Sequence, residues 1–184
     1  KNVECRGSGH VALHNCECDG ARSLDGMSVS GQGSSATARR CSFSSNDFSG
    51  VNVGHGARCE LNGCRCMESR TAAGLEVLDP GSSVIASACD LSCNTLNNVQ
   101  VTSGSAQLCD CKANSCKEGS GLLVSRQGSV TGTQCSFCSN PGSNIVALEG
   151  GRVWLKQGCK CNDSRSGWGS KAAGTGGSQV IADS

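Results

Sequence analysis

The chain has 184 residues, of which 26 are glycine and 16 are cysteine, whereas aromatic residues make up only 3% of it. A formal net charge of +1 gives no electrostatic footprint for nucleic acid or for an anionic membrane, so we predict neither partner. No apolar run reaches the length of a membrane-spanning helix, so we predict no direct membrane span.

One pattern recurs along almost the whole chain. In its clearest copies, Gly-Ser leads through an apolar pair to a cysteine, then to Phe or Leu two residues later, then to Asn, and finally to a second apolar pair. We call the cysteine of each copy its anchor. Successive anchors are 25, 23, 25, 22, 24 and 24 residues apart. The seven anchors form the cysteine ladder: Cys16, Cys41, Cys64, Cys89, Cys111, Cys135 and Cys159.

The apolar residues of each copy come in pairs two positions apart, as strands with one buried face require. In chain order the first pairs are Val11 with Leu13, Met27 with Val29, Ala36 with Ala38, Val51 with Val53, Cys59 with Leu61, Leu75 with Val77 and Val84 with Ala86. We expect three short strands per copy. A single copy cannot bury its inner face, whereas copies stacked about 4.8 Å apart can. The predicted fold is therefore all-β: a single parallel β-helix (solenoid) of about seven coils, with roughly 24 residues in each.

Two further positions support the stack. Two residues after the anchor, smaller side chains alternate with larger ones, which predicts interdigitating coils. Five residues after the anchor, every second coil has asparagine, which we expect to adopt the left-handed turn conformation. The first series is Cys18, Phe43, Cys66, Leu91, Ala113, Phe137 and Cys161, and the second is Asn46, Asn94 and Asn140.

The two ends differ from the middle. We assign residues 1–164 to the β-helix and residues 165–184 to a Gly-rich C-terminal tail, in which 179–182 is a candidate strand of a partial coil. Val3 and Cys5 fit the last strand of a preceding coil. Neither end has an obvious cap, so we expect open backbone edges there. We therefore predict protein partners at the open ends or along a sheet face, or a longer parent chain.

The repeat of apolar pair, Cys-x-Phe or Cys-x-Leu, Asn and Gly-Val-x-Val over residues 1–164 resembles the right-handed β-helix repeats of the pectin-lyase-like superfamily. The closest subset is the CASH type, found in carbohydrate-binding proteins, sugar hydrolases and F-box substrate receptors. The resemblance implies the handedness of the coil. It also implies an alternative function, which is binding or cleavage of polysaccharide.

Enzymes of that superfamily use clusters of carboxylates on an outer face, and we find no such cluster in the sequence. The outward position after each anchor would stack Arg65, Asp90 and Lys112, which reads as a surface row of charges and not as an acid/base pair. A second outward row contains one acid, Glu76. We therefore predict a non-catalytic protein, with no catalytic residue and no cofactor.

The cysteines allow four interpretations. The ladder residues point inward and fit buried packing, because a thiol behaves as a small hydrophobe. Disulfides are a second interpretation, either between ladder neighbours or among the off-ladder residues Cys93, Cys116 and Cys138, which we favour. Metal binding and a redox-active CxxC are the weakest, because flat ladders spread thiolates in a row and no helix N-terminus lowers a thiol pKa. We predict no metal site.

The remaining candidates are weak. Trp154 and Trp168 are candidates for stacking on a sugar, although packing is the commoner role. None of the three histidines has an evident carboxylate partner. Localisation follows the thiols: secreted or lumenal if they are paired, and cytosol or plastid stroma if they are free. We predict a β-helix scaffold or protein-interaction module, a segment or accessory subunit of a larger assembly such as an organellar or photosynthetic complex.

Overall fold

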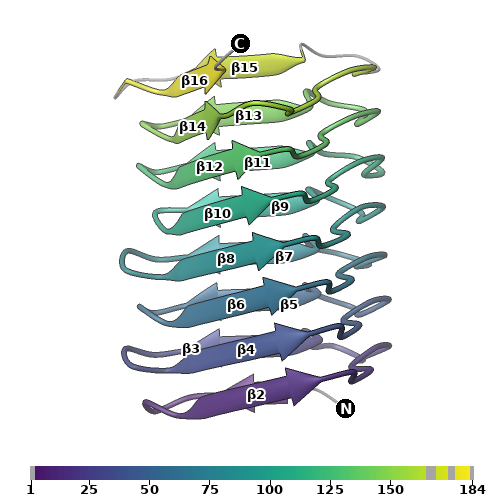
Figure 1. Cartoon of the computed structure of the whole chain (residues 1–184), viewed down its shortest axis with the longest axis vertical. Coiled ribbons are helices and arrows are strands. Elements are labelled where there is room, and N and C mark those ends of the chain that lie inside the picture. The colour runs from purple at the N-terminus through teal and green to yellow at the C-terminus, as the bar shows by residue number, and fades with distance from the viewer. Residues whose placement is uncertain (1–2, 165–168, 174–176, 183–184) are drawn as a thin grey trace.

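The strands of this protein form two parallel sheets that face each other across one narrow core (Figure 1). The computed structural model describes residues 3–164, 169–173 and 177–182. Sheet A contains β1 (Val3–Cys5), β3 (Met27–Ser30), β5 (Val51–Gly54), β7 (Leu75–Leu78), β9 (Val99–Thr102), β11 (Leu122–Ser125), β13 (Ile145–Leu148) and β15 (Ser170–Ala173). Sheet B contains β2 (His10–His14), β4 (Ser35–Arg39), β6 (Arg58–Asn62), β8 (Ser83–Ser87), β10 (Ser105–Cys109), β12 (Ser129–Thr133), β14 (Arg152–Leu155) and β16 (Gln179–Ala182).

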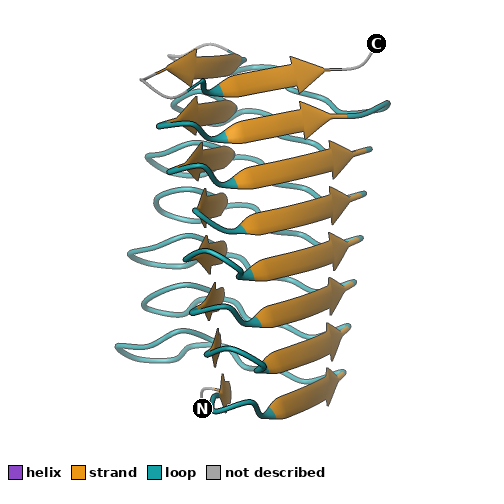
Figure 2. Ribbon diagram, turned by 90° about the vertical axis from the view of Figure 1, so that its left-hand side faces the viewer, coloured by secondary structure: helices purple, strands orange, loops and turns teal. Residues whose placement is uncertain are grey.

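Apart from the four strands at the ends of the two sheets, each strand pairs with its counterparts in the coils before and after it, so equivalent residues stack in rows (Figure 2). In sheet B, Ala36 pairs with Cys59 and Cys59 with Val84. In sheet A, Met27 pairs with Val51 and the next coil follows in the same register. The predicted fold is confirmed: a parallel β-solenoid of about seven coils, each about 24 residues long.

The third predicted strand of each coil is reduced to one residue. The residue after each anchor forms a parallel bridge with its counterpart in the next coil. Chains of single bridges suffice here because the anchor before and the apolar residue after point into the core. We call this row the bridge ladder; it consists of Glu17, Ser42, Arg65, Asp90, Lys112, Ser136 and Lys160.

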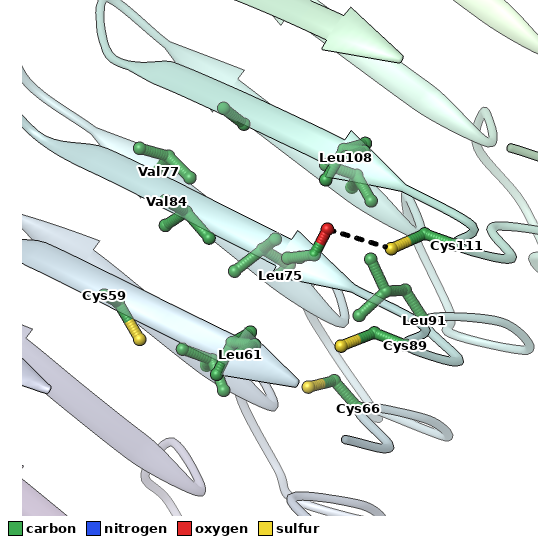
Figure 3. Packing of buried hydrophobic residues seen from close by; sticks show 14 of the residues in the cluster. Cys59, Leu61, Cys66, Leu75, Val77, Val84, Cys89, Leu91, Leu108 and Cys111 are labelled. Atoms are coloured by element: carbon green, nitrogen blue, oxygen red, sulfur yellow. Dashed lines mark hydrogen bonds between the residues drawn. The ribbon is translucent and has the colours of Figure 1, made fainter. Parts of the chain in front are cut away.

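The core compensates large side chains with small ones inside each coil. Where the residue two after the anchor is Phe43 or Phe137, the facing residue of sheet B is Ala38 or Gly132. Where it is Cys66, the facing residue is Leu61, and both are buried (Figure 3). At this level of the core, each coil has one bulky side chain, either from sheet B or from the residue two after the anchor. The source alternates from one coil to the next.

Gly132 shows how tight this fit is. A Cβ at Gly132 would lie 3.2 Å from Leu155 Cδ2, 3.6 Å from Cys159 Sγ and 3.8 Å from Phe137 Cε2. The tight contact is the one with Leu155 of the next coil, whereas the Phe137 ring lies at an ordinary van der Waals distance, so glycine here makes room mainly for Leu155. Alternation by coil, and not a uniform column of small residues, fills this core.

The predicted left-handed conformation of the asparagines is wrong by one residue. The residues with positive φ are the ones just before them, namely Ser45, Cys93 and Ser139, with φ of 57°, 63° and 59°. The asparagine side chains instead point inward, and all three residues are 0% exposed. Their side-chain amides form hydrogen bonds with backbone groups that the turn leaves unpaired. This requirement explains asparagine at these positions better than its turn propensity does.

The bonds of Asn94 illustrate this role. Its Oδ1 accepts a hydrogen bond from the Ser69 backbone N–H at 2.9 Å. Its Nδ2 donates to the carbonyl oxygens of Leu91 at 2.7 Å and Cys66 at 3.1 Å. A Cβ at Gly74 would lie 2.4 Å from this Nδ2, so the coil before each asparagine needs glycine at that point. The amide ties two successive coils together at the turn.

The C-terminal region continues the stack where the structure describes it. Strands β15 and β16 lie within residues 165–184 and pair with β13 and β14. Among the described residues there is no helix long and apolar enough to cross a membrane.

Candidate interaction surface

The bridge ladder runs along one corner of the stack and carries alternating charges on its outside. Arg65, Asp90 and Lys112 are successive bridge partners, as the sequence predicted. Among the described residues no ion pair joins Arg65 or Lys112 to Asp90. Asp90 instead accepts a hydrogen bond from the Ser92 backbone N–H at 3.2 Å. The charged side chains of the bridge ladder therefore face solvent, and no second carboxylate of this ladder lies next to Asp90.

The cysteine ladder lines the inside of the same corner. Cys41, Cys64, Cys89, Cys111 and Cys135 are buried, and Cys16 and Cys159 are half-buried at the two ends. Their thiols donate to backbone carbonyl groups, as Cys111 does to the Ala86 oxygen at 3.4 Å (Figure 3). All 16 cysteines lie in the described part of the chain and none is paired there. In this structure the ladder packs the core and bonds to the ends of the sheet B strands.

The buried thiols resist ionisation. Burial raises the pKa of Cys59 from 9.0 to about 12, and the neighbouring Cys89 adds to the rise. Burial likewise raises the pKa of the Cys161 thiol to about 12 and that of Cys66 well above 9.0. For Cys64 a hydrogen bond with the Cys89 thiol outweighs burial, and its pKa is lowered. Most of these thiols are thus poor nucleophiles and poor metal ligands at neutral pH.

We expect the free energy of unfolding to fall as the pH rises from about 9 to about 12. The Cys59 thiol ionises near pH 9 in the unfolded chain but only near 12 when folded, so the unfolded state binds fewer protons in this range. One such thiol contributes a slope of up to about 1.4 kcal/mol per pH unit. Urea unfolding at several pH values measures the slope of the free energy of unfolding against pH. Cys59→Val should remove the part of this slope that Cys59 contributes.

Cys109 provides the control for this experiment, because it is exposed and lies at the end of β10. Cys109→Ser should leave the alkaline slope unchanged. Equal slopes for the wild-type chain and Cys59→Val would contradict the assignment.

The three off-ladder cysteines lie near one corner but in different surroundings. Cys93 and Cys138 are half-buried and Cys116 is buried. Cys138 Sγ accepts a hydrogen bond from Ser136 Oγ at 3.4 Å. They are unpaired in this structure, and their pairing in solution stays a prediction. Among the described residues no group of three or more His, Cys, Asp or Glu side chains is placed to hold a metal ion.

The aromatic and histidine candidates are scattered. Trp154 is half-buried on the outer face of β14, whereas Trp168 lies outside the described residues. His10 Nδ1 lies 2.8 Å from Ser35 Oγ. The expectation that no histidine has a carboxylate partner is wrong for His55, whose Nδ1 lies 3.6 Å from Asp79 Oδ2. Both are at the surface, so the pair adds little to stability.

Glu76 was expected from its outward row, whereas Asp25, a second half-buried carboxyl group beside sheet A, was not. Burial raises the pKa of Asp25, against a hydrogen bond that its Oδ1 accepts from the Ser49 N–H at 2.9 Å. Burial also raises the pKa of Glu76, and the Asp25 charge adds to the rise. Glu76 Oε2 accepts from Asn52 Nδ2 at 3.3 Å. Such shifts make the two carboxyls candidates for acid/base chemistry, although neither lines the cavities described below.

An apolar ridge follows the turns that lead into sheet A. Leu24, Phe48 and Leu96 are 55%, 47% and 41% exposed in the first, second and fourth coils, and half-buried Ala72 lies in the third. The Phe48 N–H donates to the Leu24 carbonyl oxygen at 3.3 Å, so these two turns are in contact. These four residues define the apolar ridge. Large apolar side chains exposed in line are typical of protein contact sites.

A second surface, the arginine groove, lies on the outer face of sheet B in the same coils. A cavity of about 460 Å³ is lined by Arg39, Arg40, Glu60, Ile85 and other residues of β2, β4, β6 and β8. A cavity of about 190 Å³ beside the bridge ladder shares Arg40 and adds Arg65. A third, of about 730 Å³, begins at Arg58. We define the groove by its rim, Arg39, Arg40, Arg58 and Arg65, and by its floor, Thr37, Glu60 and Ile85.

The local fold explains why these arginines meet. Arg40 has a φ of 53°, and the residue before the next anchor, Gly63, is also left-handed at 61°. This conformation turns the chain sharply from sheet B to the bridge ladder, so Arg40 projects from the corner between the two cavities. Because these arginines occupy consecutive coils, aligning the coils in the sequence could have predicted that they lie near one another. It could not have predicted the cavities between them.

The comparisons with known proteins address the fold. The model of the family described as "Right handed beta helix region" matches residues 1–166. No curated protein sequence matches the chain. A solved structure, HetL, a pentapeptide repeat protein involved in heterocyst differentiation regulation from the cyanobacterium Nostoc sp. strain PCC 7120, is 14% identical, with 91% of this chain and 89% of that chain covered. Its TM-score is 0.20, so this likeness carries no argument. Together with the register of the two sheets, the family match shows that the chain belongs to the right-handed β-helix family.

Proposed function

We propose that the chain is a non-catalytic β-helix scaffold that binds a protein partner along one side of its first four coils, as a segment or accessory subunit of a larger assembly. The observation that carries this proposal is the apolar ridge. Elsewhere in the described chain most large apolar side chains are buried in the core, whereas Leu24, Phe48 and Leu96 are exposed in line. A rigid stack holds them at fixed spacing, which suits an extended contact surface.

Charged groups beside the ridge indicate what the partner must match. Arg70 Nη1 and Asp47 Oδ1 form an ion pair at 2.7 Å next to Phe48. A hydrogen bond from the Ser23 N–H, followed by that from Arg70, lowers the pKa of Asp47. A partner surface with an apolar groove and polar groups at its rim would complement this arrangement.

Photo-crosslinking tests the ridge in the native host. A crosslinking residue at position 48 should give one discrete adduct, and the same residue at position 157, an exposed turn position after β14, should not. Leu24→Ser with Leu96→Ser should reduce the adduct several-fold without changing the melting temperature by more than a few degrees. Identical adducts from both positions, or an adduct that the double substitution leaves unchanged, would refute the proposal.

Polysaccharide cleavage is the competing function, and Asp25 with Glu76 is the site that would perform it. Incubation with pectin and alginate should produce no new reducing or unsaturated ends. Turnover that Glu76→Gln or Asp25→Asn abolishes, while both variants remain folded, would overturn the non-catalytic assignment. The Asp90→Asn variant applies the same test to the bridge ladder.

A further inference from the structure

We infer that the arginine groove binds an extended acidic segment of a protein partner, in which two carboxylate side chains four residues apart flank an apolar one. The inference rests on the proposed function, since it names the chemistry of a segment that an interaction module would recognise. It concerns a different surface from the apolar ridge, although both lie on the first four coils.

The rim of the arginine groove carries unpaired positive charge. Among the described residues, Arg70 and Arg126 form ion pairs with Asp47 and Glu149. None of the four rim arginines forms one, although all four are exposed and lie in adjacent coils. Two acids, Glu17 and Glu60, line the same cavities and leave an excess of positive charge. Arginine is the side chain best suited to hold a carboxylate through two parallel hydrogen bonds.

The length of the groove matches an extended peptide. Arg58 begins β6, and Asn62 ends it opposite Arg39 of β4. The two ends of the groove are thus separated by four residues of extended chain, or about 13 Å. An extended peptide has its residues i and i+4 on one face at the same separation. Carboxylates at these positions would reach Arg58 at one end and Arg39 with Arg40 at the other.

The middle of the groove combines an acidic and an apolar side chain. Thr37, Glu60 and Ile85 stack in one row across β4, β6 and β8, and Ile85 is 47% exposed. An apolar residue at i+2 of the peptide would cover Ile85. A uniformly charged polyanion would instead place negative charge next to Glu60, which costs binding energy. The floor therefore favours a patterned acidic peptide over an acidic polysaccharide.

The backbone supports recognition by side chains. Strands β4, β6 and β8 are paired on both sides within sheet B. They have no free edge to which a peptide could add as a strand. Sequence preference must therefore come from the arginine rim and the floor.

The test uses the whole chain and a labelled peptide, acetyl-Ser-Glu-Ser-Leu-Ser-Glu-Ser-amide, with binding measured by fluorescence anisotropy at low salt. The peptide should bind, and its analogue with both Glu replaced by Gln should bind at least tenfold more weakly. Arg39→Gln with Arg58→Gln should weaken the acidic peptide at least tenfold. Arg152→Gln is the matched control, because Arg152 occupies the row of Arg58 on the same face, four coils away, and should change nothing.

Several results would overturn the inference: equal binding of the Gln analogue, no loss in the arginine variants, or tighter binding of polyglutamate or a sulfated polysaccharide than of the patterned peptide. If the peptide does not bind but the crosslink at position 48 still depends on the ridge residues, the inference about the groove is refuted and the proposed function is retained. Arginine-dependent binding of the peptide without that crosslink would support the groove and refute the ridge as the docking site.

Discussion

Replacing Phe137 by alanine is expected to lower the free energy of unfolding by about 3–5 kcal/mol. The side chain is 1% exposed and is the bulky residue of its coil. The wall opposite it cannot refill the space, because Gly132 has no side chain there. Leu155 of the next coil is held by its own strand pairing with β12, so the cavity should persist.

Urea unfolding followed by circular dichroism measures this loss. Phe48→Ala is the matched control, since it removes the same atoms from a side chain that is 47% exposed, and we expect it to cost less than about 1 kcal/mol. Similar losses for the two variants would contradict the description of the core.

The stack also predicts where the damage appears. Because each coil contacts only its neighbours, the loss at Phe137 weakens the interfaces with the coils of Cys111 and Cys159 before it affects distant ones. Hydrogen exchange should therefore accelerate most in β12 and β14 and least in β4 and β6.

The coil architecture could be predicted from the sequence because it rests on periodicity alone. Cysteines at a spacing of about 24 residues identify equivalent positions, and apolar pairs two apart identify strands. Once Cys59 is aligned with Ala36 and Val84, the sheet B register follows. The alternation of Phe43 with Cys66 is visible in the same way, although its compensation by Ala38 and Leu61 requires both walls to be compared.

The surfaces were harder to predict, since they depend on turns. Asp25 lies two residues before β3, in a turn whose length changes from coil to coil, so its electrostatic effect on Glu76 has no periodic signal. The exposure of Phe48 depends on the same turn, which places Ser49 in the interior and Phe48 outside. Arg40 projects into the groove because it adopts a left-handed conformation that its residue type does not favour.

The role of the asparagines was predicted only in part. A turn was expected and is present, but the left-handed residue precedes the asparagine. Propensity favours asparagine in left-handed turns, and here a competing requirement prevails: backbone groups left unpaired inside the turn need an amide that both donates and accepts. Asn46, Asn94 and Asn140 each accept from a backbone N–H of the preceding coil, at 2.8, 2.9 and 3.0 Å.

Replacing Asn94 by alanine is the sharpest test of that requirement. Its Nδ2 donates to Cys66 and Leu91, and its Oδ1 accepts from Ser69, all in buried surroundings. Alanine would leave this N–H and these carbonyls without partners. Because each lost buried bond costs about 1 kcal/mol and each unpaired group more, we expect a loss of about 3–4 kcal/mol.

Asn46→Ala is the control within the same ladder. Asn46 accepts from the Ala21 N–H at 2.8 Å, but its Nδ2 has no hydrogen-bond partner. In the fourth coil the equivalent Nδ2 also donates to Asn98 Oδ1, and the second coil has Gly50 at that position. The alanine variant at position 46 should therefore cost only about 1–2 kcal/mol. Equal losses at positions 46 and 94 in urea unfolding would show that the amides fill space and do not tie the coils together.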